Sequence, residues 1–370
     1  MNIKKKYKKY CNENYLRFNL EEEQIWKNFD KEFGESRTDE LNQLFAERYE
    51  NPSKGNPYSF CQNFKETSTL MYFQSNFFLE NSLKILELFE KIKPNLVLEL
   101  GCYNGILLNF LAELYPSQNF TGIDIEEKII KFAKERFNKN NLKFITLDYE
   151  NISKLSSHYD FIFSLFGIED IPRNVKLDKF EIRDNKDYQL KYDYFNIFFN
   201  NLKLVTKDKT LFCPLIRIPD LNCLMAFLDA GTNNHWILKD NKVDFIEGKN
   251  YTNEERIPYF LLEFVTSKNE IQKIKLDIFF ETTKKYREED NLRYVYLYNK
   301  NKSNFTELIK KDEVFYEGDQ NTLYYKIYKR LGTYMMFLWA TNGFSNYKEY
   351  NNLEELKVSF LELTSKELDL

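Results

Sequence analysis

Short apolar runs separated by amphipathic segments occupy the middle of this chain, from about residue 94 to residue 217. Continuous apolar runs of this length are typical of strands buried on both faces of a parallel sheet. Helical periodicity between the runs predicts helices over about 105–115, 126–138 and 188–205. The predicted strands are LVLEL, NFTGI, KFITL, DFIFS and TLFCPLI. This alternation of strands and helices predicts an α/β core.

The first 92 residues have the periodicity of helices and not of strands. Apolar positions recur at helical spacing in EEQIWKNFDKEF and in DELNQLFAERY, and a further helix is predicted over about 76–92. Between them, the turn-rich stretch ENPSKGNPYS contains two prolines and a glycine. We therefore predict that residues 1–92 form a helical N-terminal cap in front of a core over residues 93–302.

The chain beyond residue 217 departs from a simple strand–helix alternation. Residues 217–270 combine two apolar patches with polar stretches, and we predict an insertion over the mouth of an active site. The alternating segments IQKIKLDIFFETTKKY and NLRYVYLYN, joined by REED, predict a hairpin. Residues 303–370 form a Tyr-rich C-terminal extension, predicted to pack on the core or to make a dimer contact.

Two acids follow predicted strands in a pattern that suits a nucleoside ligand. The first strand contains Glu99 and runs into a turn with Gly101 and Gly105, then into the helix ILLNFLAELY. Such a turn presents backbone N–H groups and a helix N-terminus to the anionic end of a ligand. Asp124 ends the second strand about twenty residues later, where nucleoside-binding α/β folds hold a ribose diol. Asp148 follows the third strand.

Taken in order, ELGCYNG, GIDI, LDYEN and YDFIFS resemble the successive motifs of class I S-adenosylmethionine-dependent methyltransferases. The resemblance covers roughly residues 70–300. It implies a Rossmann-like seven-stranded, mostly parallel sheet with an antiparallel last strand, and S-adenosylmethionine as the cofactor. The predicted hairpin over 271–299 resembles the last two strands of that sheet. The resemblance also implies that the N-terminal cap covers the cofactor and part of the substrate pocket.

One position departs from the family pattern. The family usually has a third glycine in the middle of the first loop, where this chain has Tyr103. The side chain of Tyr103 must therefore point away from the cofactor or cover it. The alternative is a dinucleotide-binding Rossmann domain, which has the motif G-x-G-x-x-G. In this chain Gly101 and Gly105 are four positions apart, and the position of the motif's middle glycine is Tyr103.

The resemblance also implies roles for individual residues. Glu99 orients the loop, often through hydrogen bonds to the amino group of the ligand, and Asp124 accepts the ribose hydroxyls. Asp148, with Tyr149 beside it, faces the adenine amino group. The alternatives are structural: glycines also serve tight turns, and Asp124 suits a helix N-cap. Asp148 can likewise be a plain loop carboxylate. The full set of predicted cofactor-binding residues is Glu99, Gly101, Cys102, Gly105, Asp124, Ile125, Asp148, Tyr149 and Ser164.

Candidates for catalysis are fewer. The tail of the fourth strand, where this family places substrate-facing groups, is followed by Glu169 and Asp170, which could act as a base or hold a cationic amine. His235 has a side chain with a suitable pKa for a base, although an isolated histidine is more often structural. Phe166 and Gly167 stand where a catechol-type magnesium site needs a carboxylate, so no metal is predicted.

Composition narrows the function classes. A net charge of −4 over 370 residues gives no general attraction to nucleic acid. The tripeptide NPY at 56–58 lacks one proline of the DNA amino-methyltransferase motif and precedes the glycine turn, so a simple turn is favoured. Five widely spaced cysteines without a C-x-x-C pair, no apolar stretch near 18 residues and no signal-peptide pattern predict a cytoplasmic protein without a membrane segment. The abundance of Lys, Asn, Ile, Phe and Tyr suggests an AT-rich, bacterial-like genome.

The sequence thus predicts an enzyme that methylates a small molecule or biosynthetic intermediate at oxygen or nitrogen without a metal. Three alternatives stay open: a catalytically inactive, cofactor-binding partner subunit, a nucleic-acid or protein methyltransferase, and a nicotinamide-dependent dehydrogenase. A homodimer is compatible with the sequence.

Overall fold

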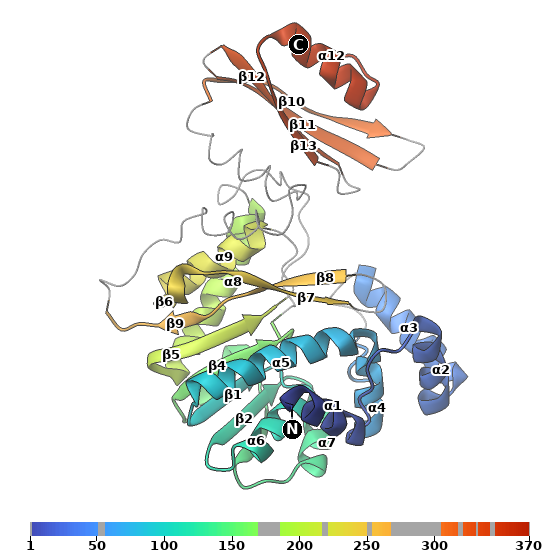
Figure 1. Ribbon diagram of the computed structural model, residues 1–370, viewed down its shortest axis with the longest axis vertical. Helices are drawn as coiled ribbons and strands as arrows, with labels where there is room; N and C mark the ends of the chain where they lie inside the picture. Colours follow the sequence, from blue (N-terminus) through green and yellow to red (C-terminus); the bar gives the residue numbers. More distant parts are fainter. Residues whose placement is uncertain are drawn as a thin grey trace. The chain divides into compact units, whose positions relative to one another are not determined.

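The core of the chain is a seven-stranded sheet in the order β3-β2-β1-β4-β5-β9-β6 (Figure 1). Strands β1 to β5 pair in parallel, while β9 is antiparallel to both of its neighbours. This arrangement confirms the predicted Rossmann-like, mostly parallel sheet with an antiparallel strand. The strands are β1 Leu96–Leu100, β2 Asn119–Asp124, β3 Leu142–Thr146, β4 Tyr159–Leu165, β5 Thr206–Leu215, β6 Trp236–Leu238 and β9 Leu262–Phe264.

The computed structural model describes most of the chain, and the account below is limited to those residues. They are 2–50, 56–168, 186–216, 221–249, 254–267, 305–316, 321–330, 332–340 and 345–369. The chain divides into two compact units, one of residues 1–174 and 190–274 and the other of residues 175–189 and 275–370.

Helices cover both faces of the sheet, which explains why its strands are apolar throughout. Val97, Phe161 and Phe163 belong to the core cluster that α5, α6 and α7 build on one face. On the other face Phe199 of α8 packs against Phe212 of β5 and Phe227 of α9. The helices are α5 Ser75–Ile92, α6 Ile106–Leu114, α7 Glu127–Arg136, α8 Lys186–Leu202 and α9 Leu221–Asn233. Burial on both faces is the condition under which parallel strands lose polar positions.

The last two strands of the sheet come from a different segment than expected. Strands β6 and β9 lie inside residues 217–270, for which the sequence predicted an insertion, and the predicted hairpin over 271–299 lies outside the described residues. Each of these strands has three residues. A strand this short completes less than two periods of alternation, so periodicity does not detect it.

An excursion between β6 and β9 does exist. It is the two-stranded hairpin of β7 Asp244–Lys249 and β8 Glu254–Tyr259, which packs on α5. Gly248 makes the close approach possible, because a Cβ atom there would lie 2.2 Å from Cδ2 of Phe77.

Within residues 2–92, every regular element that the structure describes is helical. Helix α1 packs beside the core, because the rings of Tyr7 and Tyr10 lie 4.8 and 5.0 Å from the ring of Phe110 in α6. The Tyr7 hydroxyl also donates to Ser82 Oγ of α5. The elements are α1 Ile3–Glu13, α2 Glu22–Phe33, α3 Glu35–Glu50, α4 Phe64–Leu70 and the 3₁₀ helix η1 Met71–Gln74.

The second unit has its own fold and its own core. Its four strands form an antiparallel sheet in the order β10-β11-β12-β13, and α12 contributes Leu356 and Phe360 to a cluster with Ile327 and Leu338. The elements are β10 Glu307–Tyr316, β11 Asn321–Arg330, β12 Thr333–Ala340, β13 Ser345–Tyr350 and α12 Leu353–Thr364. The described part of the C-terminal extension is therefore a small α+β layer with a separate hydrophobic core.

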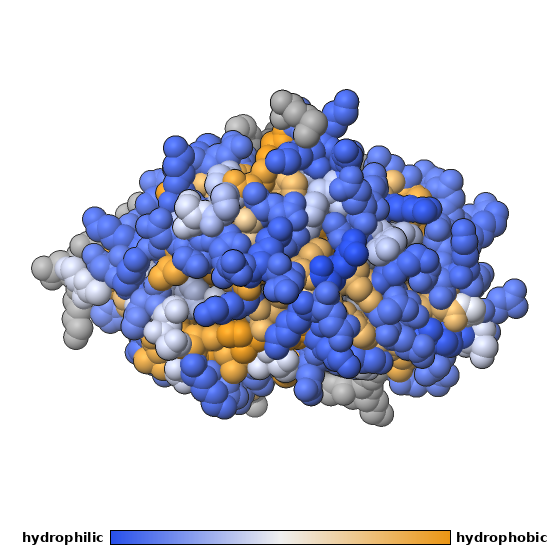
Figure 2. All heavy atoms as spheres, turned by 90° about the horizontal axis from the view of Figure 1, so that it is seen from below, coloured by the Kyte–Doolittle hydropathy of each residue, from blue (hydrophilic) through white to orange (hydrophobic). Residues whose placement is uncertain are grey.

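The surface is mainly polar on the face that Figure 2 shows, with apolar side chains gathered in patches between polar ones. Apolar atoms make up much of the surface of any folded protein, so these apolar side chains by themselves indicate no partner. Among the helices that the structure describes, we find none with the length and apolar character needed to cross a membrane.

Candidate functional site

The glycine turn, residues 101–105, joins β1 to α6 at the carboxyl edge of the sheet, where open α/β sheets bind ligands. Gly101 and Gly105 both have left-handed backbones, with φ of 69° and 73°. A Cβ atom on Gly101 would lie 2.4 Å from Cα of Gly167, and one on Gly105 would lie 2.4 Å from the Phe144 ring. The turn itself therefore requires both glycines, and any contact with a cofactor is an additional role.

Ser164 braces the turn from the end of β4. Its hydroxyl donates to the Leu100 carbonyl oxygen at 2.8 Å and accepts from the backbone N–H of Gly167 at 3.2 Å. The side chain is completely buried. Ser164 thus fixes the spacing between the ends of β1 and β4, underneath the predicted cofactor position.

Cys102 fills a gap in the sheet left by a glycine. A Cβ atom on Gly122 of β2 would lie 2.8 Å from Cys102 Sγ, so only glycine accommodates the thiol. Burial raises the pKa of Cys102 well above its ordinary value, and the neighbouring acids Asp124 and Glu99 raise it further. The group is a neutral thiol that packs the turn, and a contact of Cys102 with the cofactor stays a prediction.

Asp124 connects the end of β2 to the glycine turn. Its Oδ2 accepts from the backbone N–H of Tyr103 at 2.9 Å, and its Oδ1 accepts from the N–H of Glu126 at 3.0 Å. A carboxylate has about four acceptor positions, so these bonds leave capacity for ligand hydroxyls. Burial raises the pKa of Asp124 above its ordinary value. Ile125 beside it is 69% exposed, an apolar side chain open to solvent at the edge of the site.

Glu99 is a buried carboxyl group with an unpartnered oxygen. It is 3% exposed, and its Oε2 has no hydrogen-bond partner among the described residues. Burial raises the pKa of Glu99 well above its ordinary value, and the charge of Asp124 adds to the effect. An ammonium group of a ligand would supply the missing donor, which is the kind of group that S-adenosylmethionine carries.

Asp148 and Tyr149 lie at the end of β3, where the 3₁₀ helix η2 (Tyr149–Lys154) begins. Asp148 accepts from the N–H of Glu150 at 3.2 Å and caps that helix. The Tyr149 hydroxyl donates to the Gly167 carbonyl oxygen, and its ring packs edge-on against Phe198 of α8. The structure thus brings Tyr149 against the glycine turn. A contact of either residue with adenine stays a prediction.

The structure does not bring His235 to this edge. His235 precedes β6, and its Nδ1 lies 3.2 Å from the Val265 carbonyl oxygen. The backbone N–H of Thr266, which follows Val265, donates to Asp208 near the start of β5. His235 therefore lies toward the amino end of β5, opposite the glycine turn. Glu169 and Asp170 lie outside the described residues.

Tyr103 points away from the turn and into the N-terminal cap. Its hydroxyl donates to the Thr67 carbonyl oxygen of α4 at 3.1 Å, and its ring lies edge-on to Tyr58 at 5.6 Å. Burial raises the pKa of Tyr103 well above its ordinary value, so the phenol stays a donor. Of the two orientations that the sequence left open, this side chain follows the one away from the cofactor position.

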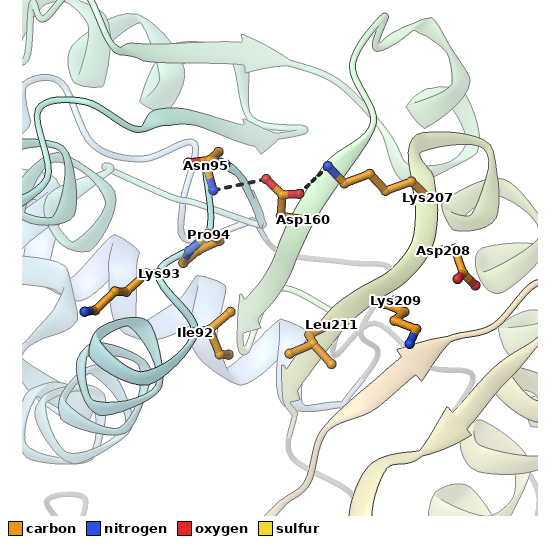
Figure 3. Close-up of a pocket in the computed structure, with 9 residues that line it drawn as sticks. All are labelled: Ile92, Lys93, Pro94, Asn95, Asp160, Lys207, Asp208, Lys209 and Leu211. Carbon is orange, nitrogen blue, oxygen red and sulfur yellow. Dashed lines mark hydrogen bonds and ion pairs between the residues drawn. The ribbon is translucent and has the colours of Figure 1, made fainter.

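Figure 3 shows a pocket of about 270 Å³ at the opposite edge of the sheet. Asp160 there accepts from the backbone N–H of Asn95 at 3.0 Å and pairs with Lys207, which ties the starts of β1, β4 and β5 together. The lining residues are Ile92, Lys93, Pro94, Asn95, Asp160, Lys207, Asp208, Lys209 and Leu211. This pocket is separate from the glycine turn. Among the described residues, no three acidic, histidine or cysteine side chains gather as metal ligands.

Comparison with known proteins finds methyltransferases. Residues 97–180 match a family model described as a methyltransferase domain. Over 82 residues, the chain is 35% identical to a malonyl-(acyl-carrier protein) O-methyltransferase from Acetivibrio thermocellus, covering 22% of this chain and 28% of that one. Over 168 residues, it is 27% identical to a tRNA (guanine-N(7)-)-methyltransferase from Prochlorococcus marinus, covering 45% and 77%.

A solved SAM-dependent methyltransferase from Methanosarcina mazei is 13% identical, with a TM-score of 0.36, covering 50% of this chain and 98% of that one. The fold assignment rests on the strand order and not on this distant likeness. With the family match and the strand order, the resemblance seen in the sequence is confirmed: residues 97–180 belong to a methyltransferase domain of the class I, S-adenosylmethionine-dependent type, whose cofactor is S-adenosylmethionine.

We predict that Asp124→Ala weakens the binding of S-adenosylhomocysteine at least tenfold. Hydrogen bonds to a charged group contribute roughly 1.5–3 kcal/mol each, and the substitution removes both acceptor oxygens. Asp124→Asn retains one acceptor oxygen and should lie between wild type and Asp124→Ala. Titration calorimetry measures the affinities, and urea unfolding controls for stability. Wild-type affinity in a stable Asp124→Ala protein would rule out the ribose assignment.

We predict that Glu99→Gln changes the pH dependence of stability. Because folding raises the pKa of Glu99, its contribution to stability is fully present below the unfolded pKa of about 4.3 and is lost as pH rises through the raised folded value. The variant does not ionise, so its free energy of unfolding relative to wild type should increase between pH 5 and pH 8. Urea unfolding measures this, with the exposed Glu135→Gln as control. Parallel profiles for Glu99→Gln and wild type would contradict the prediction.

Proposed function

We propose that this chain transfers a methyl group from S-adenosylmethionine to oxygen or nitrogen of a small molecule or biosynthetic intermediate, without a metal. The observation that carries the proposal is the set of groups at one sheet edge. An unpartnered buried carboxyl of Glu99, a tight glycine turn, the acceptor Asp124 and the exposed Ile125 lie at the ends of β1 and β2.

These residues fit the three parts of the cofactor. The Glu99 carboxyl can accept a hydrogen bond from the ammonium group, and Asp124 has acceptor positions for the ribose hydroxyls. Ile125 offers an apolar surface to the adenine ring. When bound, the cofactor supplies an electrophilic methyl group on a sulfonium. The protein then has to position the acceptor in line with that methyl group and exclude water, which is where most of the rate enhancement arises.

An alcohol or a protonated amine would also need a base to take its proton, while a neutral amine or a carboxylate has a free lone pair and would not. Glu169 and Asp170 stay the predicted candidates for such a base, because they follow β4 closely in sequence. His235 is not proposed for this role, since its side chain faces Val265 near the opposite sheet edge.

The choice of a small acceptor rests on charge. The net charge of −4 provides no field that would attract a polyanion. Within the basic run at residues 4–9, Lys4 is paired with Glu80 at 2.9 Å and Lys9 with Glu13 at 3.7 Å. The tRNA methyltransferase likeness, which spans 77% of that relative, supports RNA as the second candidate acceptor. The chain spans only 28% of the O-methyltransferase named first, so that protein's substrate is not carried over.

We predict methyl transfer from labelled S-adenosylmethionine into a metabolite fraction of low molecular mass, and none into total RNA or protein. Asp124→Ala serves as the matched control with weakened cofactor binding, because its acceptor surfaces are unchanged. Label in RNA at a rate above this control would overturn the small-acceptor proposal. Tight binding of S-adenosylhomocysteine with no transfer to any fraction would favour an inactive partner subunit.

We predict that methyl transfer persists in excess EDTA. The described residues after β4, which include Phe166 and Gly167, offer no carboxylate beside the turn to hold magnesium. Rates are compared with and without chelator on the same enzyme preparation. Loss of turnover that magnesium restores would show that a metal takes part in the reaction.

A further inference from the structure

Tyr103 has a backbone conformation that is unfavourable for its side chain. Its φ is 47°, in the left-handed region, which is unfavourable for a residue with a Cβ and costs glycine nothing. Such strain persists only where the surroundings hold the residue, and it often marks a functional position. The question is therefore what holds Tyr103 in this conformation and what the arrangement gains.

Two hydrogen bonds fix the residue from opposite ends. The backbone N–H donates to Asp124 Oδ2 at 2.9 Å, and the phenol donates to the Thr67 carbonyl oxygen of α4 at 3.1 Å. The ring between them packs against Tyr58. Tyr103 is thus a direct connection from the predicted ribose acceptor to the N-terminal cap.

Neighbouring bonds close the same junction. Asn104 Nδ2 lies 3.1 Å from Thr67 Oγ1 and 3.3 Å from Ser68 Oγ, and both oxygens are buried. On the other side of Asp124, Asn56 Nδ2 donates to Glu126 Oε2 at 2.9 Å. The segment 56–68 of the cap is therefore bonded to the chain on both sides of the predicted cofactor position.

We propose that Tyr103 is a positioning residue that locks the glycine turn to helix α4, so that the cofactor site and the cap form as one unit. The proposal rests on the proposed function and deepens it. A glycine at this position leaves the turn independent of the cap. With tyrosine, the conformation of the turn that binds the cofactor depends on contact with the cap. The cap is likewise held by the turn, which the bound cofactor stabilises.

This coupling has a measurable cost when it is broken. If the turn samples other conformations once the bond to α4 is lost, the apparent affinity for the cofactor falls in proportion to the fraction of molecules whose turn can bind it. Tyr103→Phe keeps the ring and removes the bonds of the phenol, to the Thr67 carbonyl and to the Cys61 side chain. The net contribution of such a bond corresponds to about a threefold to tenfold change in an equilibrium constant. Tyr103 makes no predicted contact with the cofactor, so the loss would act through the turn.

The chain offers a matched control in Tyr72. Its hydroxyl donates to the Tyr15 carbonyl oxygen at 2.8 Å, the same type of bond, within the cap and away from the glycine turn. Both Tyr103→Phe and Tyr72→Phe should lower stability by similar amounts. Only Tyr103→Phe should weaken S-adenosylhomocysteine binding, about threefold to tenfold by calorimetry. Thr67→Val, which removes the acceptor of Asn104 but keeps the carbonyl, should weaken binding in the same direction.

Hydrogen exchange tests the coupling directly in the full chain. In wild type, S-adenosylhomocysteine should protect residues 101–105 and also residues 64–70 of α4. In Tyr103→Phe, protection at 101–105 should remain while protection at 64–70 is lost or greatly reduced. Tyr72→Phe should retain both.

The outcomes separate this inference from the proposed function. No binding of S-adenosylhomocysteine to wild type would contradict the proposed function and with it the premise. Binding to wild type with no protection at 64–70, or equal affinities of Tyr103→Phe and Tyr72→Phe, would overturn the positioning role alone. In that case Tyr103 would be a structural contact that happens to lie beside the turn.

Discussion

The hydrogen bond from the Tyr103 N–H to the Asp124 carboxylate is the interaction on which the rest of the site depends. It joins the loop after β1 to the end of β2, and Ser164 joins the same loop to β4. Three parallel strands thereby present their ends at a fixed spacing. Because the same carboxylate is the predicted ribose acceptor, the group that shapes the turn is also the group that would recognise the nucleoside.

Much of the core was predictable because its strands are long and buried. Strands β1 to β5 have five to ten residues, and continuous apolar runs of that length stand out against the helices around them. Strands β6 and β9 were not predictable, because three residues carry no periodicity. The alternating segment over 271–299 attracted the assignment of the last strands instead, since alternation is the strongest local signal that a strand has.

The residues of the site also differ in whether local sequence could predict them. Gly101, Gly105 and Asp124 were identified because their roles depend on local backbone geometry and on position relative to a strand end. The contacts of Tyr103 and Asn104 with α4 join residues 36 and 37 positions apart, and no local pattern reports such a contact. One signal was present in the sequence. A large side chain at a position where the family uses glycine needs somewhere to go, and the turn-rich NPY segment at 56–58 supplies part of that place through Tyr58.

The electrostatics of the site tie ligand binding to stability. Glu99 is buried and Asp124 is half-buried, burial raises the pKa of each, and the charge of Asp124 opposes the ionisation of Glu99. A fold that keeps an unpartnered acid in its core gives up stability that an amide would retain. A cationic ammonium group would remove the repulsion at Glu99, and ribose hydroxyls would fill the acceptor positions at Asp124. Any ligand that binds only the folded state also raises its stability in proportion to the logarithm of its concentration. The repulsion between Glu99 and Asp124 is thus the energetic counterpart of the affinity for a cationic nucleoside, and the link through Tyr103 to α4 extends the effect of binding from the turn into the cap.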